Sequence, residues 1–310
     1  MSGPYNLIAI IGPTASGKTA FAARLALHVD GEIISADSRQ VYRKMNLGTG
    51  KDYSDYFVDG IRIPCHLTDI ADPGYRYSVF EYQRDFYRVF RDLRLRGRLP
   101  VLCGGSGLYI NAALRGYKLI DVPHHAVLRA RLASKSLEEL SSMLSAMKEM
   151  HNVTDVDSRE RALRAIEISM YYREHPDQTG ERPDIDPLYI GILYDRALER
   201  KLITARLESR LKQGMVEEVS QLLESGVPAE TMSYYGLEYR YITSYLQGKT
   251  DYSSMVSLLN TAIHQFAKRQ RTWFRKMERE GCLIHWLDGE MPTAEKLDKV
   301  LKLFDPDQTR

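Results

Sequence analysis

Residues 7–19 read Leu-Ile-Ala-Ile-Ile-Gly-Pro-Thr-Ala-Ser-Gly-Lys-Thr, and this stretch decides the fold. The mostly apolar run at residues 6–11, which is closed by a glycine, is typical of a short buried strand in a parallel sheet. Residues 18–28 then carry apolar side chains at helical spacing. Between the two, residues 12–19 match G-x-x-x-x-G-K-[ST], the pattern of a loop that binds phosphate groups.

The chemistry of phosphate binding explains the residue types of this loop. Glycines allow successive backbone N–H groups to point inward, and the following helix adds the positive end of its dipole. Lys18 supplies a positive charge to a polyphosphate, and the hydroxyl group of Thr19 is placed to hold Mg²⁺. The alternative is a glycine turn with a surface lysine, and the loop alone does not identify the phosphate compound. The predicted phosphate-binding residues are Gly12, Pro13, Thr14, Ala15, Ser16, Gly17, Lys18 and Thr19, and Thr19 is also the predicted metal ligand.

Strands and helices alternate along much of the chain. The sequence predicts strands at 32–35, 99–103 and 188–193, and helices at 78–95, 196–225 and 253–280. This alternation is typical of an α/β fold with helices on both faces of a parallel sheet, here of the phosphate-loop (P-loop NTPase-like) class. From about residue 119 to 187 strand signals vanish, and helices are predicted at 128–150 and 158–173. We expect an α/β core of residues 1–117 and 187–310, with a helical insertion at 118–186.

The composition is that of a soluble globular protein, because 44% of the 310 residues are hydrophobic, 27% are charged and the formal net charge is +2. Cys65, Cys103 and Cys282 lie far apart in sequence, which argues against a disulfide framework or a structural zinc site. The apolar run near the N-terminus is too short to span a membrane and lacks the basic start of a signal peptide. A cytoplasmic location without a membrane partner is expected.

A carboxylate follows the second predicted strand, in the segment Ser-Ala-Asp-Ser-Arg-Gln at residues 35–40. Ligands of open parallel sheets gather at the carboxyl ends of the strands, so Asp37 should lie near the phosphate-binding loop. Such a carboxylate can accept a proton from an attacking nucleophile or support Mg²⁺. The alternative is that Asp37 only caps the next helix.

Further segments of the chain occur in a specific order after the phosphate-binding loop. They are Asp37-Ser38, Tyr42 with Met45 to Lys51, His66 to Asp69, Gly104 to Tyr109, Arg206 to Arg210 with Met215, and Ala267 to Arg275. Together with the loop sequence Gly-Pro-Thr-Ala-Ser-Gly-Lys-Thr, they resemble the motifs of the tRNA dimethylallyltransferase (isopentenyltransferase) family. The resemblance extends along nearly the whole chain.

This resemblance implies a reaction. In the family, the N6 amine of adenosine 37 in the anticodon loop of tRNA attacks the allylic carbon of dimethylallyl diphosphate, and diphosphate leaves. A carboxylate such as Asp37 would assist this poor nucleophile, while Lys18, Mg²⁺ on Thr19 and the arginine that matches Arg210 would stabilise the leaving group. The expected catalytic residues are therefore Asp37, Thr19 and Arg210. Arg206 lies one turn from Arg210 on the same helix face, and a solvated basic face is the alternative for this pair.

The resemblance also implies a surface for tRNA. On the basic helix near the C-terminus, Lys268, Arg271 and Arg275 share a face that suits a phosphate backbone, unless this is only a solvated surface helix. The neighbouring aromatic side chains Phe266, Trp273 and Phe274 are expected to pack into the core. The other expected tRNA contacts are Asp37, Ser38, Arg39, Gln40 and Ser106, and, in the insertion, Arg129, Glu160, Arg161, Ala162, Leu163 and Arg164. The enzyme must extrude a stacked adenosine in order to reach it.

Two residues depart from the family pattern. Glu238 stands where the family commonly has a glycine, and His264 stands where an arginine is common. Both are expected on the RNA side, leaving the donor site intact.

Three other functions remain open from the sequence. The donor site would also serve an adenylate isopentenyltransferase that acts on free AMP, ADP or ATP. The loop alone would fit a nucleotide or metabolite kinase, and an RNA-binding or nucleotide-sensing module would be non-enzymatic. The helical insertion and the basic C-terminal helix favour a large RNA acceptor, served by an enzyme that is expected to be a monomer.

Overall fold

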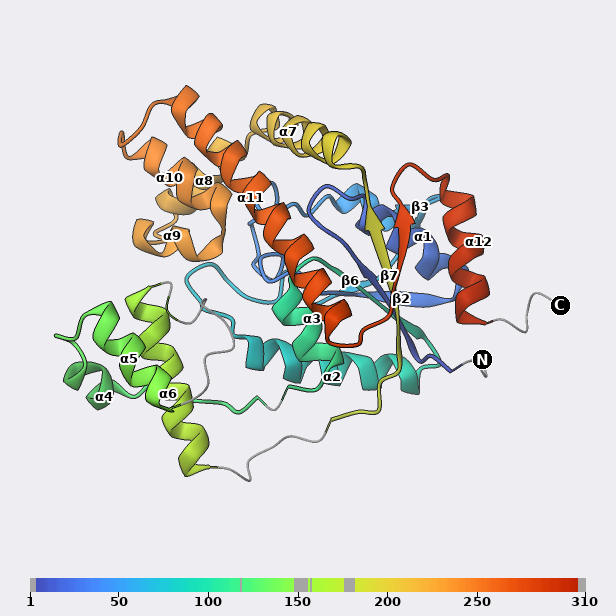
Figure 1. The fold of residues 1–310 in the computed structure, drawn as a ribbon. Helices are drawn as coiled ribbons and strands as arrows, with labels where there is room; N and C mark the ends of the chain where they lie inside the picture. Colours follow the sequence, from blue (N-terminus) through green and yellow to red (C-terminus); the bar gives the residue numbers. More distant parts are fainter. Residues whose placement is uncertain (1–3, 118, 148–155, 157, 176–181, 306–310) are drawn as a thin grey trace. The chain divides into compact units, whose positions relative to one another are not determined.

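The computed structural model describes residues 4–117, 119–147, 156, 158–175 and 182–305. Its centre is a six-stranded sheet in the order β5-β2-β6-β1-β7-β8, in which every neighbouring pair is parallel (Figure 1). The strands are β1 Leu7–Ile11, β2 Gly31–Ser35, β5 Cys65–His66, β6 Leu99–Gly104, β7 Pro187–Leu193 and β8 Ile284–Asp288. A separate antiparallel pair joins β3 (Phe57–Val58) to β4 (Ile61–Arg62). The predicted α/β fold with a parallel sheet is confirmed.

The sheet positions the phosphate-binding loop at its centre. All five residues of β1 are buried, as a strand covered on both faces requires. β1 pairs with β6 on one side and β7 on the other, with Ile8 opposite Val101 and Leu188. The loops that follow β1, β2 and β6 therefore meet at one edge of the sheet.

Helices cover both faces of the sheet (Figure 1). On one face, Ile8 and Ile10 pack with side chains of α1 (Lys18–His28) and α12 (Thr293–Phe304). On the other face, the alternate strand residues pack with α2 (Val79–Leu95), α3 (Gly107–Leu114) and α11 (Tyr252–Arg279). The apolar residues of each strand thus divide between two separate cores, which is typical of a three-layer α/β protein.

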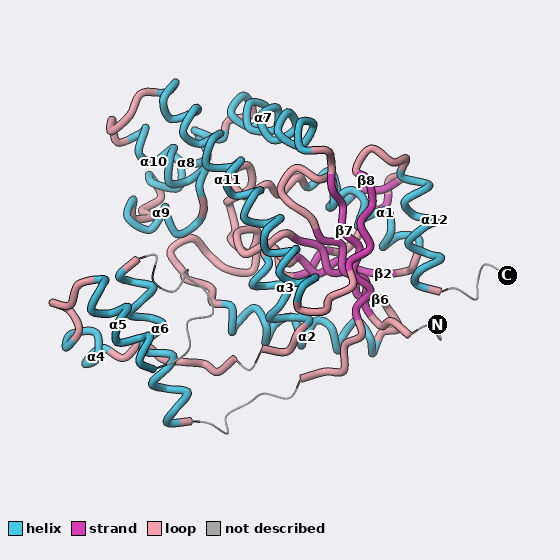
Figure 2. Tube along the Cα trace, in the orientation of Figure 1, coloured by secondary structure: helices cyan, strands magenta, loops and turns pink. Residues whose placement is uncertain are grey.

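A group of helices precedes α11 in the chain (Figure 2). It consists of α7 (Arg196–Lys212), α8 (Met215–Glu224), α9 (Ala229–Tyr235) and α10 (Leu237–Leu246). The prediction of one helix at 196–225 is wrong, because Gly214 has a φ of 100° and separates α7 from α8. A short 3₁₀ helix, η1 (Tyr53–Tyr56), follows the loop that connects β2 to the rest of the core. No helix of the described residues is long and apolar enough to cross a membrane.

The chain divides into two compact units, residues 1–117 with 183–310, and residues 118–182. The smaller unit contains α4 (Ala126–Arg131), α5 (Leu137–Met147) and α6 (Arg159–Glu174), which share a core of their own. The single helix predicted at 128–150 is therefore two helices, and residues 148–150 lie outside the described part. The second boundary falls at 182/183 instead of 186/187, because Ile185 is buried in the core of the larger unit.

Candidate active site at the carboxyl edge of the sheet

The phosphate-binding loop has the backbone shape that its sequence predicts. Gly17 has a φ of 71°, in the left-handed region where glycine is favoured, and Ala15 has a φ of 61°. The backbone N–H of Thr14 donates to Oε1 of Gln270 at 2.8 Å, and Nζ of Lys18 donates to the Pro13 carbonyl at 3.1 Å. A phosphate group would replace the carbonyl as the partner of Lys18.

Several groups of this loop are prepared for an anion. Burial lowers the pKa of Lys18; Cys103 and Asp37 raise it, while Arg206 and Arg210 lower it further. This balance means that positive charge is concentrated around an amine that a bound anion would stabilise. Gly12 and Pro13 are buried, and the buried hydroxyl of Ser16 has no hydrogen-bond partner among the described residues.

Gln270 is a site residue that the sequence analysis missed. Its side chain is only 7% exposed and lies on α11. Besides accepting from Thr14, it donates through Nε2 to the carbonyl of Gly105 at 2.9 Å, in the loop after β6. The amide thus fixes the phosphate-binding loop against the neighbouring loop, and the only sequence signal was a polar residue on the buried face of the basic helix.

The metal site has few protein ligands. The described residues contain no group of three or more His, Cys, Asp or Glu side chains that could hold a metal ion. Thr19 lies at the start of α1 beside Cys103, whose thiol pKa is raised to about 12 by burial despite the attraction of Lys18. The residues fit a Mg²⁺ ion that is bound largely through a diphosphate and water, as Mg²⁺ commonly is, with Thr19 as the protein ligand.

Asp37 begins a turn at the end of β2. Its Oδ1 accepts the backbone N–H of Arg39 at 2.9 Å. No helix follows before η1, so the alternative that Asp37 caps the next helix is wrong. The adjacent N–H of Ser38 donates to Oγ of Ser106 at 3.1 Å, which brings the loops after β2 and β6 together as predicted.

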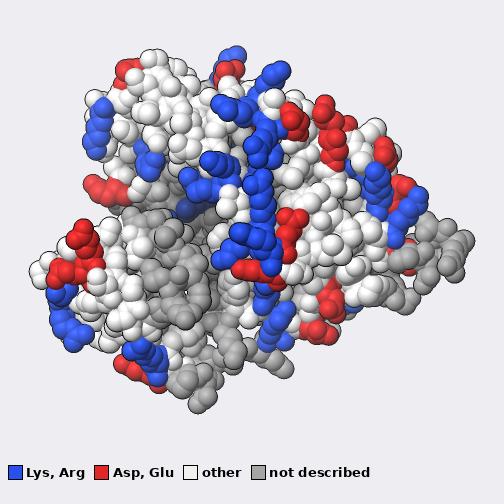
Figure 3. Space-filling view, viewed as in Figure 1, with Lys and Arg blue, Asp and Glu red and all other residues white. Residues whose placement is uncertain are grey.

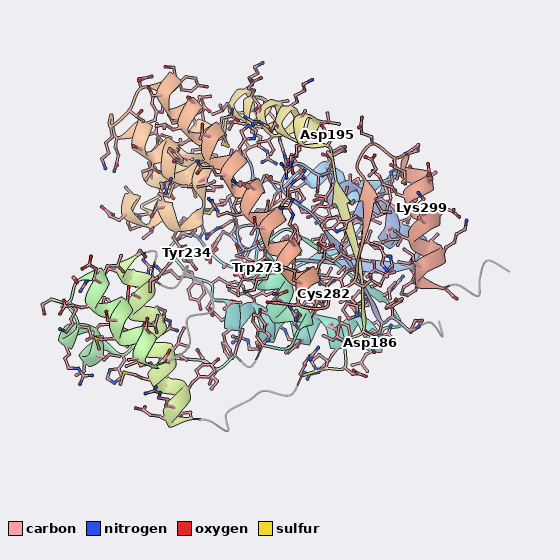
Figure 4. All side chains as sticks on the ribbon, viewed as in Figure 1. Asp186, Asp195, Tyr234, Trp273, Cys282 and Lys299 are labelled. Carbon is pink, nitrogen blue, oxygen red and sulfur yellow. The ribbon has the colours of Figure 1, made fainter. Side chains whose placement is uncertain are left out.

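The side chains that follow Asp37 are held by other elements. The guanidinium of Arg39 donates to the carbonyl of Tyr234 and lies 5.3 Å from the centre of its ring, at the end of α9 (Figure 4). Nε2 of Gln40 donates to the carbonyl of Gly50 at 3.1 Å. Both residues therefore shape the loop around Asp37, and nothing in the structure tests whether they also contact RNA.

Arg206 and Arg210 lie together, as their spacing predicts, and share a carboxylate that the sequence analysis missed. Nη2 of Arg206 lies 2.6 Å from Oδ2 of Asp52, and Nη2 of Arg210 lies 3.1 Å from the same oxygen. Burial raises the pKa of Asp52, but the charges and hydrogen bonds of the two arginines lower it by more. Arg210 is only 9% exposed, so this is a formed ion-pair cluster and not a solvated basic face.

Glu218 of α8 holds the loop that carries Asp52. Its carboxylate accepts the backbone N–H groups of Asn46 at 2.8 Å, Leu47 at 2.8 Å and Gly48 at 3.0 Å. Its Oε1 also accepts the hydroxyl of Tyr239 at 2.7 Å. A carboxylate with this many donors is a strong fixed point for the loop.

A pocket of about 290 Å³ lies against the phosphate-binding loop. Apolar side chains and the charged cluster share its wall, which is a suitable lining for a ligand with an anionic and an apolar end. The lining residues are Thr14, Ala15, Ile203, Arg206, Leu207, Arg210, Met215, Glu238 and Ile263.

Both residues that depart from the family pattern were misplaced by the sequence analysis. Glu238 lines this pocket together with Thr14 and Arg210, so the expectation that it leaves the donor site intact is wrong. Nε2 of His264 lies 3.2 Å from Oγ1 of Thr204, which directs the imidazole toward α7. Burial lowers the pKa of His264, Arg200 lowers it further and Glu199 raises it.

The basic helix presents a column of Lys and Arg side chains along α11 (Figure 3). Lys268 and Arg275 are exposed, as predicted for a surface that binds a phosphate backbone. Arg271 is a correction, because its guanidinium pairs with Glu199 at 2.9 Å and donates to the Tyr194 carbonyl at 3.0 Å. It connects α11 to α7 instead of facing solvent.

The aromatic residues of α11 differ among themselves. Phe274 is buried, as expected, and Trp273, at the middle of the helix in Figure 4, is partly buried against the same core. Phe266 is 38% exposed, so the expectation that it packs into the core is wrong.

In the insertion, several predicted tRNA contacts are internal. Ala162 is 0% and Leu163 is 5% exposed, and both belong to the core of this unit, so these two predictions are wrong. Arg129 pairs with Glu160 at 2.9 Å and Glu167 at 2.7 Å, and Arg164 pairs with Glu167 at 3.2 Å. Arg129 and Arg164 therefore stabilise the unit itself. The side chain of Arg161 is exposed at the start of α6.

Comparison with known proteins gives a consistent result. The sequence matches the IPP transferase family over residues 40–277 and the isopentenyl transferase family over residues 5–70. It is 56% identical over 301 residues to tRNA dimethylallyltransferase 1 of Parabacteroides distasonis, covering 97% of this chain and 98% of that protein. It is 58% identical over 296 residues to tRNA dimethylallyltransferase 2 of Bacteroides fragilis, covering 96% and 97%.

Solved structures agree at the level of the whole fold. The tRNA isopentenylpyrophosphate transferase of Bacillus halodurans is 30% identical, with a TM-score of 0.70 that covers 96% of this chain and 95% of that one. A eukaryotic dimethylallyltransferase that acts on tRNA is 20% identical, with a TM-score of 0.73 over 98% of this chain and 77% of the other, and it supports the fold alone. By sequence along nearly its full length, the chain belongs to the IPP transferase family, the family of the tRNA dimethylallyltransferases.

Proposed function

We propose that this protein transfers a dimethylallyl group from dimethylallyl diphosphate to N6 of adenosine 37 in the anticodon loop of tRNA, releasing diphosphate. The observation that carries the proposal is the pocket beside the phosphate-binding loop, which combines cationic and apolar walls. A nucleotide kinase needs a polar site for its base and ribose, whereas this lining suits a short apolar group on a diphosphate.

The donor would bind with its two ends in different surroundings. Backbone N–H groups of the loop, Lys18 and the arginine pair would hold the diphosphate, in a bidentate manner where a guanidinium faces two oxygens. Ile203, Leu207 and Met215 supply apolar surface for the dimethylallyl group. Mg²⁺, if bound at Thr19, would supply further positive charge to the leaving group.

The transfer is a displacement at the allylic carbon. A new C–N bond forms to the adenine N6 as the C–O bond to diphosphate breaks, and both electrons of the C–O bond leave with the diphosphate. The carboxylate of Asp37 accepts the proton that N6 loses. Arg210 and Lys18 stabilise the negative charge that grows on the leaving oxygen, where preorganised donors contribute most.

The acceptor is proposed to be tRNA instead of a free nucleotide. The exposed basic residues of α11 support this choice, because a phosphate backbone needs a row of cations that a mononucleotide does not. Its relatives from Parabacteroides and Bacteroides are named for the same acceptor. A monomeric enzyme in the cytoplasm, where unmodified tRNA is present, completes the proposal.

The test is to offer radiolabelled dimethylallyl diphosphate with unmodified tRNA, AMP or ATP in separate reactions. Label should appear in tRNA only, and it should be lost when adenosine 37 is replaced by guanosine. Label in AMP or ATP would support the free-nucleotide enzyme instead. Phosphoryl transfer from ATP to a small acceptor would contradict the proposal in favour of a kinase.

A further inference from the structure

Glu238 places a carboxylate in a pocket that otherwise suits an anion. It lines the pocket beside Thr14 and Ala15 of the phosphate-binding loop and beside Arg206 and Arg210. Its carboxylate is attracted by both arginines without a side-chain hydrogen bond to either among the described residues, and it accepts its own backbone N–H. The carboxylate is therefore free to face a ligand.

The charges of the pocket balance before any ligand binds. Asp52 already forms ion pairs with Arg206 and Arg210. Asp52 and Glu238 together carry two negative charges against the two positive charges of the arginines, and Lys18 supplies the remaining one. Each negative charge on a ligand therefore meets Glu238 as a like charge in a partly buried site, where such repulsion is screened less than in water.

We propose that Glu238 is a specificity-determining residue, which selects diphosphates against polyphosphates of higher charge such as nucleoside triphosphates. This inference rests on the proposed function of the pocket as the donor site. The repulsion from Glu238 grows with the number of charges on the ligand, whereas the apolar wall attracts only a ligand that carries an apolar group. Repulsive elements of this kind are a general means of specificity.

A purely structural role for Glu238 makes a different prediction. Glu238 lies in the first turn of α10, where a carboxylate stabilises the positive end of a helix dipole. If this were its whole role, neutralising the side chain would lower thermal stability and leave ligand affinity unchanged.

The protonation state of Glu238 provides a second readout. Burial raises the pKa of this carboxyl and the charge of Asp37 raises it further, while its own N–H, Arg210 and Arg206 lower it. A group with a raised pKa is charged above that pKa and neutral below it. The selection against high charge should therefore be complete at pH 8 and weaken as the pH falls through the pKa of Glu238.

The experiment measures binding of inorganic pyrophosphate and tripolyphosphate by calorimetry at pH 8 and fixed magnesium concentration, so that no transferase activity is required. Glu238→Gln should bind pyrophosphate roughly tenfold more tightly than the wild type, the effect of about one pKa unit of interaction. It should bind tripolyphosphate with a larger gain, so the preference for pyrophosphate decreases. At pH 6 the difference between wild type and variant should be smaller.

The matched control is Glu208→Gln, which removes a charge from the exposed side of α7, and neither affinity should change. Glu238→Ala serves as a second variant if the glutamine variant is unstable. Unchanged affinity for both ligands in either folded Glu238 variant would overturn the proposal. Absence of pyrophosphate binding in every protein would overturn the donor site itself, and this inference with it; transferase activity without such selectivity would overturn only the role of Glu238.

Discussion

At the scale of single residues, the site depends on which carboxylates are occupied. Asp52 is engaged by two guanidinium groups, and Glu218 by backbone N–H groups and a hydroxyl. Asp37 uses one oxygen in a turn and has its pair of serine-bonded loops beside it. Among the three, Asp37 is the carboxylate with an oxygen left to accept a proton at the edge of the sheet.

Asp37→Asn therefore tests the chemical step with the least change in shape. The asparagine oxygen can still accept the N–H of Arg39, so the turn should persist. The rate of transfer should fall by about 10²–10⁴-fold, the usual contribution of a general base. Single-turnover transfer of label to tRNA measures the rate, with tRNA and pyrophosphate affinities measured in parallel. A rate within threefold of the wild type would remove Asp37 from the reaction.

The sequence predicted some of these residues and could not predict others. The phosphate-binding loop and the arginine pair follow local rules, namely a turn pattern and helical spacing, so position in sequence sufficed. Asp52 and Gln270 act through partners far away in the chain, on α7 and in the phosphate-binding loop respectively. No local pattern distinguishes them from ordinary polar residues, and only the fold brings the partners together.

At the scale of elements, α8 supports the site although it contributes little to its lining. Glu218 collects three backbone N–H groups of the loop at residues 46–48, and this loop leads directly to Asp52. The position of the arginine pair thus depends on a helix outside the sheet. The carboxylate should be needed for binding the donor and also for stability.

Glu218→Gln should raise the KM for dimethylallyl diphosphate and lower the free energy of unfolding by about 1.5–3 kcal/mol, the value of a lost charged hydrogen bond. The control is Glu217→Gln, which removes the same charge from the exposed neighbour on α8. Steady-state kinetics and chemical denaturation measure both effects. Equal behaviour of the two variants would mean that the loop keeps its position without Glu218.

The elements themselves were predicted where the pattern was long or strongly apolar. β1, α1, α2 and α11 agree with their predicted ranges within one or two residues. β8 was missed because His285 and Trp286 interrupt its apolar run, and β5 because it has only two residues. The short α9 and α10 were missed because residues 229–246 carry tyrosines and a glycine where a regular helical pattern would be needed.

At the scale of the whole molecule, charge is distributed so that a small net value hides a basic surface. The formal net charge is only +2, yet Lys and Arg side chains line the exposed part of α11 (Figure 3). Arg271 lies on the same helix but is consumed by Glu199. The structure therefore separates basic residues that can reach a phosphate backbone from one that stabilises the fold, a distinction that helical spacing alone does not make.

Neutralising Lys268 and Arg275 together should weaken tRNA binding without changing thermal stability. Since each lost phosphate contact releases fewer counterions, the slope of log affinity against log salt should become shallower by about 0.7–0.9 per contact. Arg271→Gln should do the opposite: it leaves Glu199 partly buried without its ion pair, so it should lower the melting temperature and leave the salt slope unchanged. Salt titrations of tRNA binding with parallel melting curves distinguish the two cases. An unchanged slope in the double variant at unchanged stability would place the RNA surface elsewhere, and the exposed Arg161 of the insertion is then the next residue to test.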